Sequence, residues 1–177
     1  MVYTCKYKSS IGDILLATDE IGLIGLWFEG QKYFANTLPD EHIPQETEIL
    51  TETIKWLDMY FFGEEPNFTP PLHPSGSSFR QAVWQLLLQI PYGQTITYGE
   101  IARRMAEVKK VPLMSAQAVG GAVGHNEISI IIPCHRVVGT NGSLTGYGGG
   151  IDKKISLLNL EHADMSHLFI PKKGTAL

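Results

Sequence analysis

A proline-rich segment divides the chain into two parts. Residues 63–76, GEEPNFTPPLHPSG, contain four prolines and no helix or strand periodicity, so we expect an extended, semi-rigid connection there. The formal charge changes sign across this segment: residues 1–75 hold 4 Lys/Arg and 12 Asp/Glu, whereas residues 76–177 hold 10 Lys/Arg and 6 Asp/Glu. We therefore predict two domains, 1–75 and 76–177. Only the second would attract a polyanion, although its charge also suits an ordinary solvated face.

Composition and length restrict the class of protein. A chain of 177 residues with 44% hydrophobic and 18% charged residues is typical of a soluble protein with one core or two small ones. The N-terminus has no basic segment followed by an apolar run, and no stretch has the ~18 apolar residues of a membrane span. The two cysteines, Cys5 and Cys134, suggest free thiols in a reducing compartment. We expect a cytoplasmic protein.

The two parts differ in their periodicity. Residues 2–8, 14–18 and 23–29 predict a three-stranded meander, and residues 46–62 predict an amphipathic helix that ends before Gly63. The second part is helical. Its first helix starts at a cap, Ser77 or Ser78, and ends at residues 91–93, and a capping box, Thr97 with Glu100, opens a short helix that reaches Met105.

Ser115 can cap a further helix that runs to Val123, and with the preceding helix it resembles a helix-turn-helix. This helix has almost no large exposed side chains, and its Gly120–Gly121 pair lowers helix propensity. Two interpretations stay open: close packing against another helix, or close approach to a ligand. Because only Gln117 could read base edges, a slim helix of this kind suits a minor groove, about 6 Å wide, better than sequence readout in a major groove.

Cys134 lies between Pro133 and His135, after an apolar run that includes Ile130, Ile131 and Ile132. A thiol beside an imidazole is the minimum for an activated nucleophile, because a nearby base favours the reactive thiolate. A lone cysteine in an apolar run is also common in protein cores, so packing alone would explain it as well.

Several motifs together resemble the O6-alkylguanine-DNA alkyltransferases, also called methylated-DNA–protein-cysteine methyltransferases. The matching residues are Pro91-x-Gly93, Tyr98-Gly99-x-Ile101-Ala102, Ala118-Val119-Gly120, Asn126, Pro133-Cys134-His135-Arg136-Val137, Gly142–Gly150 and Leu157–Glu161. The resemblance implies an α+β fold. A small ribonuclease-H-like N-terminal α/β domain would precede a helical C-terminal domain that carries a winged-helix-like helix-turn-helix and the active-site cysteine.

The resemblance also implies direct-reversal DNA repair. The protein would flip an alkylated guanine out of duplex DNA and move the O6-alkyl group, methyl in the simplest case, irreversibly to Cys134. O4-methylthymine would be a second substrate. A thioether has no electrophilic carbonyl to hydrolyse, so each molecule would act once. The resemblance implies double-stranded DNA that contains O6-alkylguanine as the partner, and we expect a monomer with no membrane partner.

The resemblance assigns roles to individual residues. Cys134 would be the acceptor, His135 its base through a bridging water, and Glu161 the partner of the imidazole. Asn126 would brace the DNA-facing helix against the active-site turn, and Tyr98 would rotate a phosphate and donate a hydrogen bond to the guanine. The predicted DNA-binding residues are Ser115, Ala116, Gln117, Ala118, Gly120 and Gly121, and the predicted pocket residues are Val123, Val137, Tyr147, Gly148 and Tyr98.

Two residues depart from the family pattern, and one neighbour of the cysteine needs a separate explanation. Gln117 replaces a usual arginine, which predicts weaker support for base flipping. Glu127 replaces a common proline and would add negative charge on the DNA side. We expect Arg136 to tie the site to the N-terminal half.

Other functions fit parts of the same sequence pattern. The alternatives are a protein that binds alkylated bases without repairing them, a helix-turn-helix regulator and a cysteine hydrolase. Cys5, His42 and His73 show no spacing of metal ligands, so we predict no metal and no cofactor.

Overall fold

The first 75 residues form a small sheet covered by a helix in the computed structural model, which describes residues 1–172. Strands β1 (Tyr3–Ser9), β2 (Gly12–Thr18) and β3 (Leu23–Phe28) form an antiparallel meander. The short β4 (Ile43–Pro44) pairs parallel to β1, giving the order β3-β2-β1-β4. The three predicted strands are confirmed to within two residues. Strand β4 has no predicted counterpart, because two residues carry no periodic signal.

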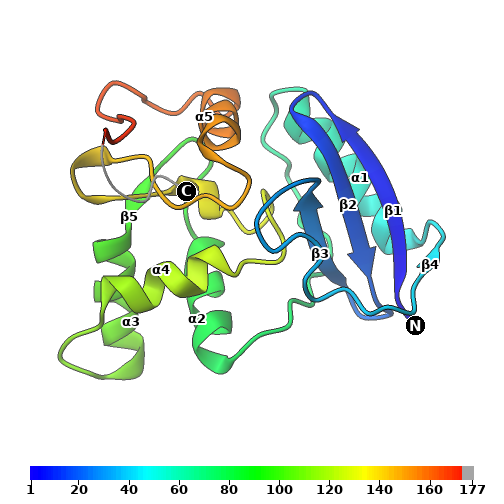
Figure 1. Ribbon diagram of the computed structural model, residues 1–177, viewed down its shortest axis with the longest axis horizontal. Helices are drawn as coiled ribbons and strands as arrows, with labels where there is room; N and C mark the ends of the chain where they lie inside the picture. Colours follow the sequence, from blue (N-terminus) through cyan, green and yellow to red (C-terminus); the bar gives the residue numbers. More distant parts are fainter. Residues whose placement is uncertain (173–177) are drawn as a thin grey trace. The chain divides into compact units, whose positions relative to one another are not determined.

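Helix α1 (Glu48–Phe61) packs on this sheet and closes the core of the first unit (Figure 1). It starts where the Thr47 hydroxyl accepts a hydrogen bond from the Leu50 amide, and its buried side includes Leu50, Leu57 and Tyr60. The periodicity at residues 46–62 therefore predicts this helix correctly. Apolar residues that recur every third or fourth position form one face of a helix, and this face packs on the sheet.

A segment from much later in the chain, Glu127–Ile131, belongs to the first unit. The Leu26 amide donates to the Glu127 carbonyl at 2.8 Å, and the Ser129 amide donates to the Leu26 carbonyl at 3.0 Å. The Glu127 carboxylate accepts hydrogen bonds from Trp27 Nε1 at 2.7 Å and from the Thr37 hydroxyl at 3.2 Å. The expectation that Glu127 adds charge on the DNA side is therefore wrong: its side chain is buried and hydrogen-bonded inside the first unit.

The second unit, Gly76–Asn126 and the chain from Ile132 onward, is mainly helical. Helices α2 (Ser78–Leu87), α3 (Tyr98–Lys109) and α4 (Ala116–Gly124) pack on one another (Figure 1). Trp84 Nε1 of α2 donates to the Ala122 carbonyl of α4 at 2.9 Å. The helix-turn-helix is formed by α3 and α4, and α3 is followed by its C-terminal cap, Lys110, in the left-handed conformation with φ 54°. The α+β prediction is confirmed.

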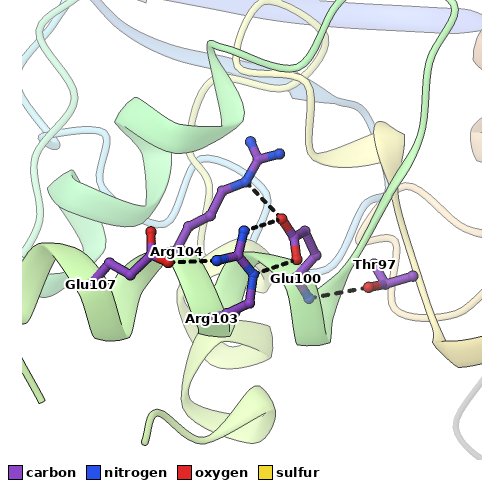
Figure 2. A network of polar contacts seen from close by, with 5 residues as sticks. All are labelled: Thr97, Glu100, Arg103, Arg104 and Glu107. Carbon is purple, nitrogen blue, oxygen red and sulfur yellow. Dashed lines mark hydrogen bonds and ion pairs between the residues drawn. The ribbon is translucent and has the colours of Figure 1, made fainter. Parts of the chain in front are cut away.

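The start of α3 carries half of the predicted capping box. The Thr97 hydroxyl accepts from the Glu100 amide at 3.1 Å, but the Glu100 carboxylate binds Arg103 and Arg104 instead of the cap (Figure 2). Hydrogen bonds from these two arginines lower the pKa of Glu100 to about 2. Part of the positive charge of α3 is thus neutralised on its own surface.

The remaining elements hold the segment around Cys134. The strands β5 (Ile96–Thr97) and β6 (Val137–Val138) form a short parallel ladder, and the 3₁₀ turn η1 (Cys134–Arg136) leads into β6. A second 3₁₀ turn, η2 (Thr140–Gly142), precedes the helix α5 (Ile151–Leu160). Within residues 1–172, no helix is both long and apolar enough to cross a bilayer.

Candidate active site and DNA-facing helix

Cys134 begins the turn η1 and is held by backbone hydrogen bonds. Its amide donates to the Ile132 carbonyl at 2.8 Å, and its carbonyl accepts from the Val137 amide at the end of the turn. The side chain is 8% exposed. Burial raises the pKa of the Cys134 thiol, although the hydrogen bond from Asn126 and the positive charge of Lys154 act in the opposite direction. The resting cysteine is therefore a thiol that needs a base.

Asn126 connects the end of α4 to this turn. It follows His125, the C-terminal cap of α4, and its Nδ2 donates to the Ile132 carbonyl at 2.8 Å and to Cys134 Sγ at 3.2 Å. One buried amide thus contacts both the backbone before the cysteine and the sulfur itself. This geometry suits the bracing role that the resemblance implies for Asn126.

His135 and Glu161 form a buried pair next to the cysteine. His135 Nε2 lies 2.7 Å from Glu161 Oε2, and both side chains are fully buried. Burial lowers the pKa of His135 more than Glu161 raises it. Burial opposes ionisation of Glu161, but hydrogen bonds from His135 and Arg136 outweigh it and hold the pKa of Glu161 below its usual value. The pair is therefore a neutral imidazole that donates to a carboxylate.

The other imidazole nitrogen, Nδ1 of His135, is buried and has no hydrogen-bond partner among residues 1–172. Buried polar atoms of this kind are uncommon and call for an explanation. Because Nε2 is bound to the carboxylate, Nδ1 is the nitrogen that can accept a proton.

Arg136 binds within the second unit. Its Nε donates to Glu161 Oε1 at 2.6 Å, its Nη2 also contacts Glu161, and its Nη1 donates to the Ile90 carbonyl at 2.7 Å. The expectation that Arg136 ties the site to the N-terminal half is wrong. The sequence around a charged side chain does not show which residue will bind it. Here the partner of Arg136 is the Glu161 carboxylate, which also binds His135.

The predicted pocket residues lie on different elements. The Tyr98 hydroxyl, at the start of α3, donates to the Thr145 carbonyl at 3.3 Å, and a Cβ added to Gly146 would lie 2.8 Å from that hydroxyl. Tyr98 is half-buried. Tyr147, which is buried, and Gly148, which is half-buried, lie in the loop that contains Gly146. Val137 is buried beside η1, whereas Val123 is buried in the packed side of α4.

The exposed side of α4 carries small side chains and no charged residue. Its N-terminus is capped by Ser115 Oγ, which accepts from the amides of Gln117 and Ala118. Gly120 and Gly121 have no atom within 4 Å of an added Cβ. The glycine pair therefore does not serve close packing against the described residues, and approach to a ligand stays a prediction. The predicted DNA-binding residues all lie exposed or half-exposed on this helix or its cap: Ser115, Ala116, Gln117, Ala118, Gly120 and Gly121.

Lys154 is a buried residue near the cysteine that the sequence predictions miss. It lies in α5 between Ile151 and Leu158, at a helical spacing where an apolar side chain is expected. A lysine at such a position was the sequence signal that could have identified it as a special residue. Among residues 1–172, no group of three or more His, Cys, Asp and Glu side chains could hold a metal ion.

Comparisons with known proteins agree with these features. The family profile described as "6-O-methylguanine DNA methyltransferase, ribonuclease-like domain" matches residues 1–74, and the one described as "6-O-methylguanine DNA methyltransferase, DNA binding domain" matches residues 78–163. The methylated-DNA–protein-cysteine methyltransferase of Methanosarcina acetivorans is 45% identical over 161 residues, which cover 90% of this chain and 98% of the relative. The protein of the same name from Haemophilus influenzae is 42% identical, with coverage of 90% and 86%.

A solved structure matches over nearly the whole chain. The crystal structure of Mycobacterium tuberculosis OGT in complex with DNA has a TM-score of 0.78 and 40% sequence identity, and the match covers 94% of each chain. The helix-turn-helix, together with the match of residues 78–163 to a DNA-binding domain, indicates a DNA-binding protein. The chain belongs to the 6-O-methylguanine DNA methyltransferase family, so the resemblance found in the sequence is confirmed.

Proposed function

We propose that this chain repairs alkylated duplex DNA by direct reversal, moving the methyl group from O6 of guanine to Sγ of Cys134. One observation carries the proposal: Asn126 donates to the sulfur, and the adjacent His135 donates to Glu161, in a single buried group. The name of the relatives, methylated-DNA–protein-cysteine methyltransferase, describes the same reaction.

The protonation states favour His135 as the base. Its imidazole is neutral in the resting protein because burial lowers its pKa, and Cys134 is a thiol because burial raises its pKa. As the reaction begins, the thiol proton passes through a water molecule to His135 Nδ1. The imidazolium that forms is stabilised by the Glu161 carboxylate, which is already ionised and already bound to Nε2.

The transfer itself exchanges one bond for another. The Cys134 sulfur forms a bond to the methyl carbon, and the bond from that carbon to guanine O6 breaks. The electron pair of the broken bond stays on the guanine, which is released as the normal base once it is protonated. The product is an S-methylcysteine thioether, which water does not cleave, so one molecule carries out one transfer.

Tyr98 and the neighbouring loop are suited to holding the flipped base. Burial raises the pKa of Tyr98, so the phenol stays protonated and can donate a hydrogen bond as charge develops on the guanine ring. The close approach of Gly146 to the Tyr98 hydroxyl leaves no room for a side chain there. Tyr147, Gly148 and Val137 would complete the pocket, while Val123 would support it from within α4.

The DNA is the proposed partner of α4. The open surface at Gly120 and Gly121 suits approach to the minor groove. We propose further that residues 1–75 and 76–177 act as separate domains, that O4-methylthymine is a second substrate, and that the protein works as a cytoplasmic monomer.

Mass spectrometry of the product tests the proposal. After incubation with a duplex that contains O6-methylguanine, we expect one added methyl group per molecule, on Cys134, and none in the Cys134→Ser variant. Cys5 is an internal control, because burial raises the pKa of its thiol to about 11. Tight binding of the methylated duplex without methylation would instead indicate a protein that only senses the damage. Methylation of another residue, or repeated turnover, would also contradict the proposal.

A further inference from the structure

The connection between α3 and α4 carries exposed apolar side chains. Residues 108–114, VKKVPLM, form the α3–α4 turn, which loops outward beside the start of α4 (Figure 1). Leu113 is 85% exposed, Val108 58% and Val111 40%. Single exposed apolar side chains are ordinary on a protein surface. Three of them within six residues form a patch that suits contact with a partner.

The same turn carries two unpaired positive charges. Lys109 and Lys110 are exposed, and neither forms an ion pair within residues 1–172. Arg103 and Arg104, the other cations of the two helices, are paired with glutamates of α3 (Figure 2). Helix α4 itself has no charged residue. The unpaired positive charge of the helix-turn-helix is therefore concentrated in the turn, directly before the uncharged helix.

The backbone of the turn is strained at one of these lysines. Lys110 has φ 54° and ψ 44°, and its amide donates to the Glu107 carbonyl at 3.2 Å. The next amide, that of Val111, donates to the Ala106 carbonyl at 3.0 Å. Glycine usually takes this position after a helix, because a side chain is strained in the left-handed conformation. A lysine at a position that favours glycine points to a use for its ammonium group beyond folding.

Duplex DNA complements both kinds of side chain in the turn. Phosphates line the rim of the minor groove and attract ammonium groups, and the sugars of the groove wall accept apolar side chains. Leu113 and Gln117 are four residues apart, so their Cα atoms lie within about 14 Å of each other even in an extended chain. This distance corresponds to about four nucleotide steps along one strand. The turn is therefore within reach of the groove that α4 would enter.

We propose that the α3–α4 turn is a second DNA-binding surface: Lys109 and Lys110 bind phosphates beside the groove that α4 enters, and Leu113 packs on the sugars of its wall. This inference rests on the proposed function in one respect, that α4 faces the DNA, and it does not depend on methyl transfer. The turn supplies the electrostatic attraction to DNA that the uncharged α4 lacks. Because its contacts go to the backbone, they are the same on methylated and unmodified duplexes.

The salt dependence of DNA binding tests the lysines. Fluorescence anisotropy measures the affinity of the full chain for an unmodified duplex and for an O6-methylguanine duplex, from about 50 to about 200 mM salt. Lys109→Ala with Lys110→Ala should weaken both complexes by the same factor and reduce the slope of log affinity against log salt by about two, since each phosphate contact releases about one counterion. Lys8→Ala with Lys55→Ala removes the same charge from exposed positions of the first unit and should keep the wild-type slope.

A glycine at position 110 separates DNA binding from folding. Lys110→Gly removes the ammonium group and relieves the backbone strain. The variant should melt about 2–4 °C higher than the wild type, while its salt slope falls by about one. A Lys110→Gly protein that keeps the wild-type slope and affinity would overturn the role of this lysine.

A serine at position 113 tests the apolar contact. Leu113→Ser should weaken both complexes about tenfold without changing the salt slope, because it removes packing and no charge. Ile21→Ser, at an exposed isoleucine of the first unit, is the matched control and should bind as the wild type does. Sedimentation velocity without DNA tests a second copy of the chain as the partner instead. A wild-type dimer that Leu113→Ser dissociates would overturn this inference.

The rate of methyl transfer at saturating DNA distinguishes the two proposals. All turn variants should keep the wild-type rate there, because the turn contributes to binding and not to the reaction. A wild-type protein that shows the expected salt slopes and transfers no methyl group would overturn the proposed function and support the role of the turn. Wild-type affinity and slope in both the double lysine variant and Leu113→Ser would overturn the role of the turn and leave the proposed function intact.

Discussion

Glu161 is the single carboxylate that both His135 and Arg136 bind beside Cys134. We expect Glu161→Gln to abolish most methyl transfer and to lower the free energy of unfolding by about 3 kcal/mol, because the amide leaves a buried guanidinium without a countercharge. Urea unfolding and single-turnover transfer measure the two effects. The exposed Asp164→Asn should change neither quantity appreciably. A Glu161→Gln protein as stable as the wild type would show that the pair with Arg136 contributes nothing.

Gln117 is exposed in the first turn of α4, where it has neither the charge nor the reach of the arginine that the resemblance implies for this position. We expect Gln117→Arg to bind a methylated duplex about tenfold more tightly and to repair it faster, since one well-placed Arg contact is worth about 1–3 kcal/mol. Fluorescence anisotropy and single-turnover kinetics on one duplex measure both quantities.

The matched control for this change is Gln85→Arg, which adds the same charge on the exposed side of α2. It should leave the repair rate close to that of the wild type. Equal affinity and equal rate for Gln117→Arg and the wild type would mean that residue 117 does not take part in base flipping.

Single residues also show what local sequence cannot predict. The sequence shows directly that Cys134 and His135 are neighbours, whereas Glu161 as the partner of His135 came from the resemblance. The partner of Arg136 and the location of Glu127 were predicted wrongly, because both depend on contacts between residues far apart in sequence. Lys154 was missed although its position on the apolar face of α5 was a signal, because the carbonyls that receive its hydrogen bonds are not neighbours in the sequence.

At the scale of elements, α4 combines low helix propensity with an open surface. Gly121 is exposed, and an added Cβ would meet no atom within 4 Å. We expect Gly121→Ala to raise the free energy of unfolding by about 0.5–1 kcal/mol, because alanine loses less conformational entropy in a helix. If α4 faces the DNA as proposed, the same methyl group should weaken binding to the methylated duplex, since it would project from that surface.

Thermal unfolding and fluorescence anisotropy measure the two opposite effects. Gly124→Ala, also open but in the last turn of α4, should stabilise the fold without weakening DNA binding. Undiminished affinity in Gly121→Ala would argue against groove contact at that position.

Elements with strong periodicity were predicted well, and short ones were not. The meander, α1 and the helix-turn-helix follow from repeated apolar positions and from Thr or Ser caps. The two-residue strands β5 and β6 have no counterpart among the predictions, since their pairing joins residues about forty positions apart. Helix α5 has none either, because it begins after Gly150 without a side-chain cap and carries a lysine on its apolar side.

At the scale of the whole molecule, the interactions around Cys134 and the segment Glu127–Ile131 belong to different units. The hydrogen bonds of Cys134, Asn126, His135 and Glu161 are all made within the second unit. Ile128 and Ile130, in contrast, are fully buried and belong to the first unit with β3. A fragment that begins at Gly76 would therefore keep the reacting groups and expose two isoleucines.

We expect this fragment to accept a methyl group on Cys134 but to melt at a lower temperature than the full chain, because burying one isoleucine is worth about 1.5–3 kcal/mol. Replacing both isoleucines, Ile128→Ser with Ile130→Ser, should reduce aggregation of the fragment and destabilise the full chain, where the hydroxyls would be buried. Calorimetry, light scattering and mass spectrometry of the methylated peptide follow these effects in parallel. A folded fragment that takes no methyl group would mean that the first unit supplies something the reaction requires, which would contradict the assignment of the chemistry to the second unit.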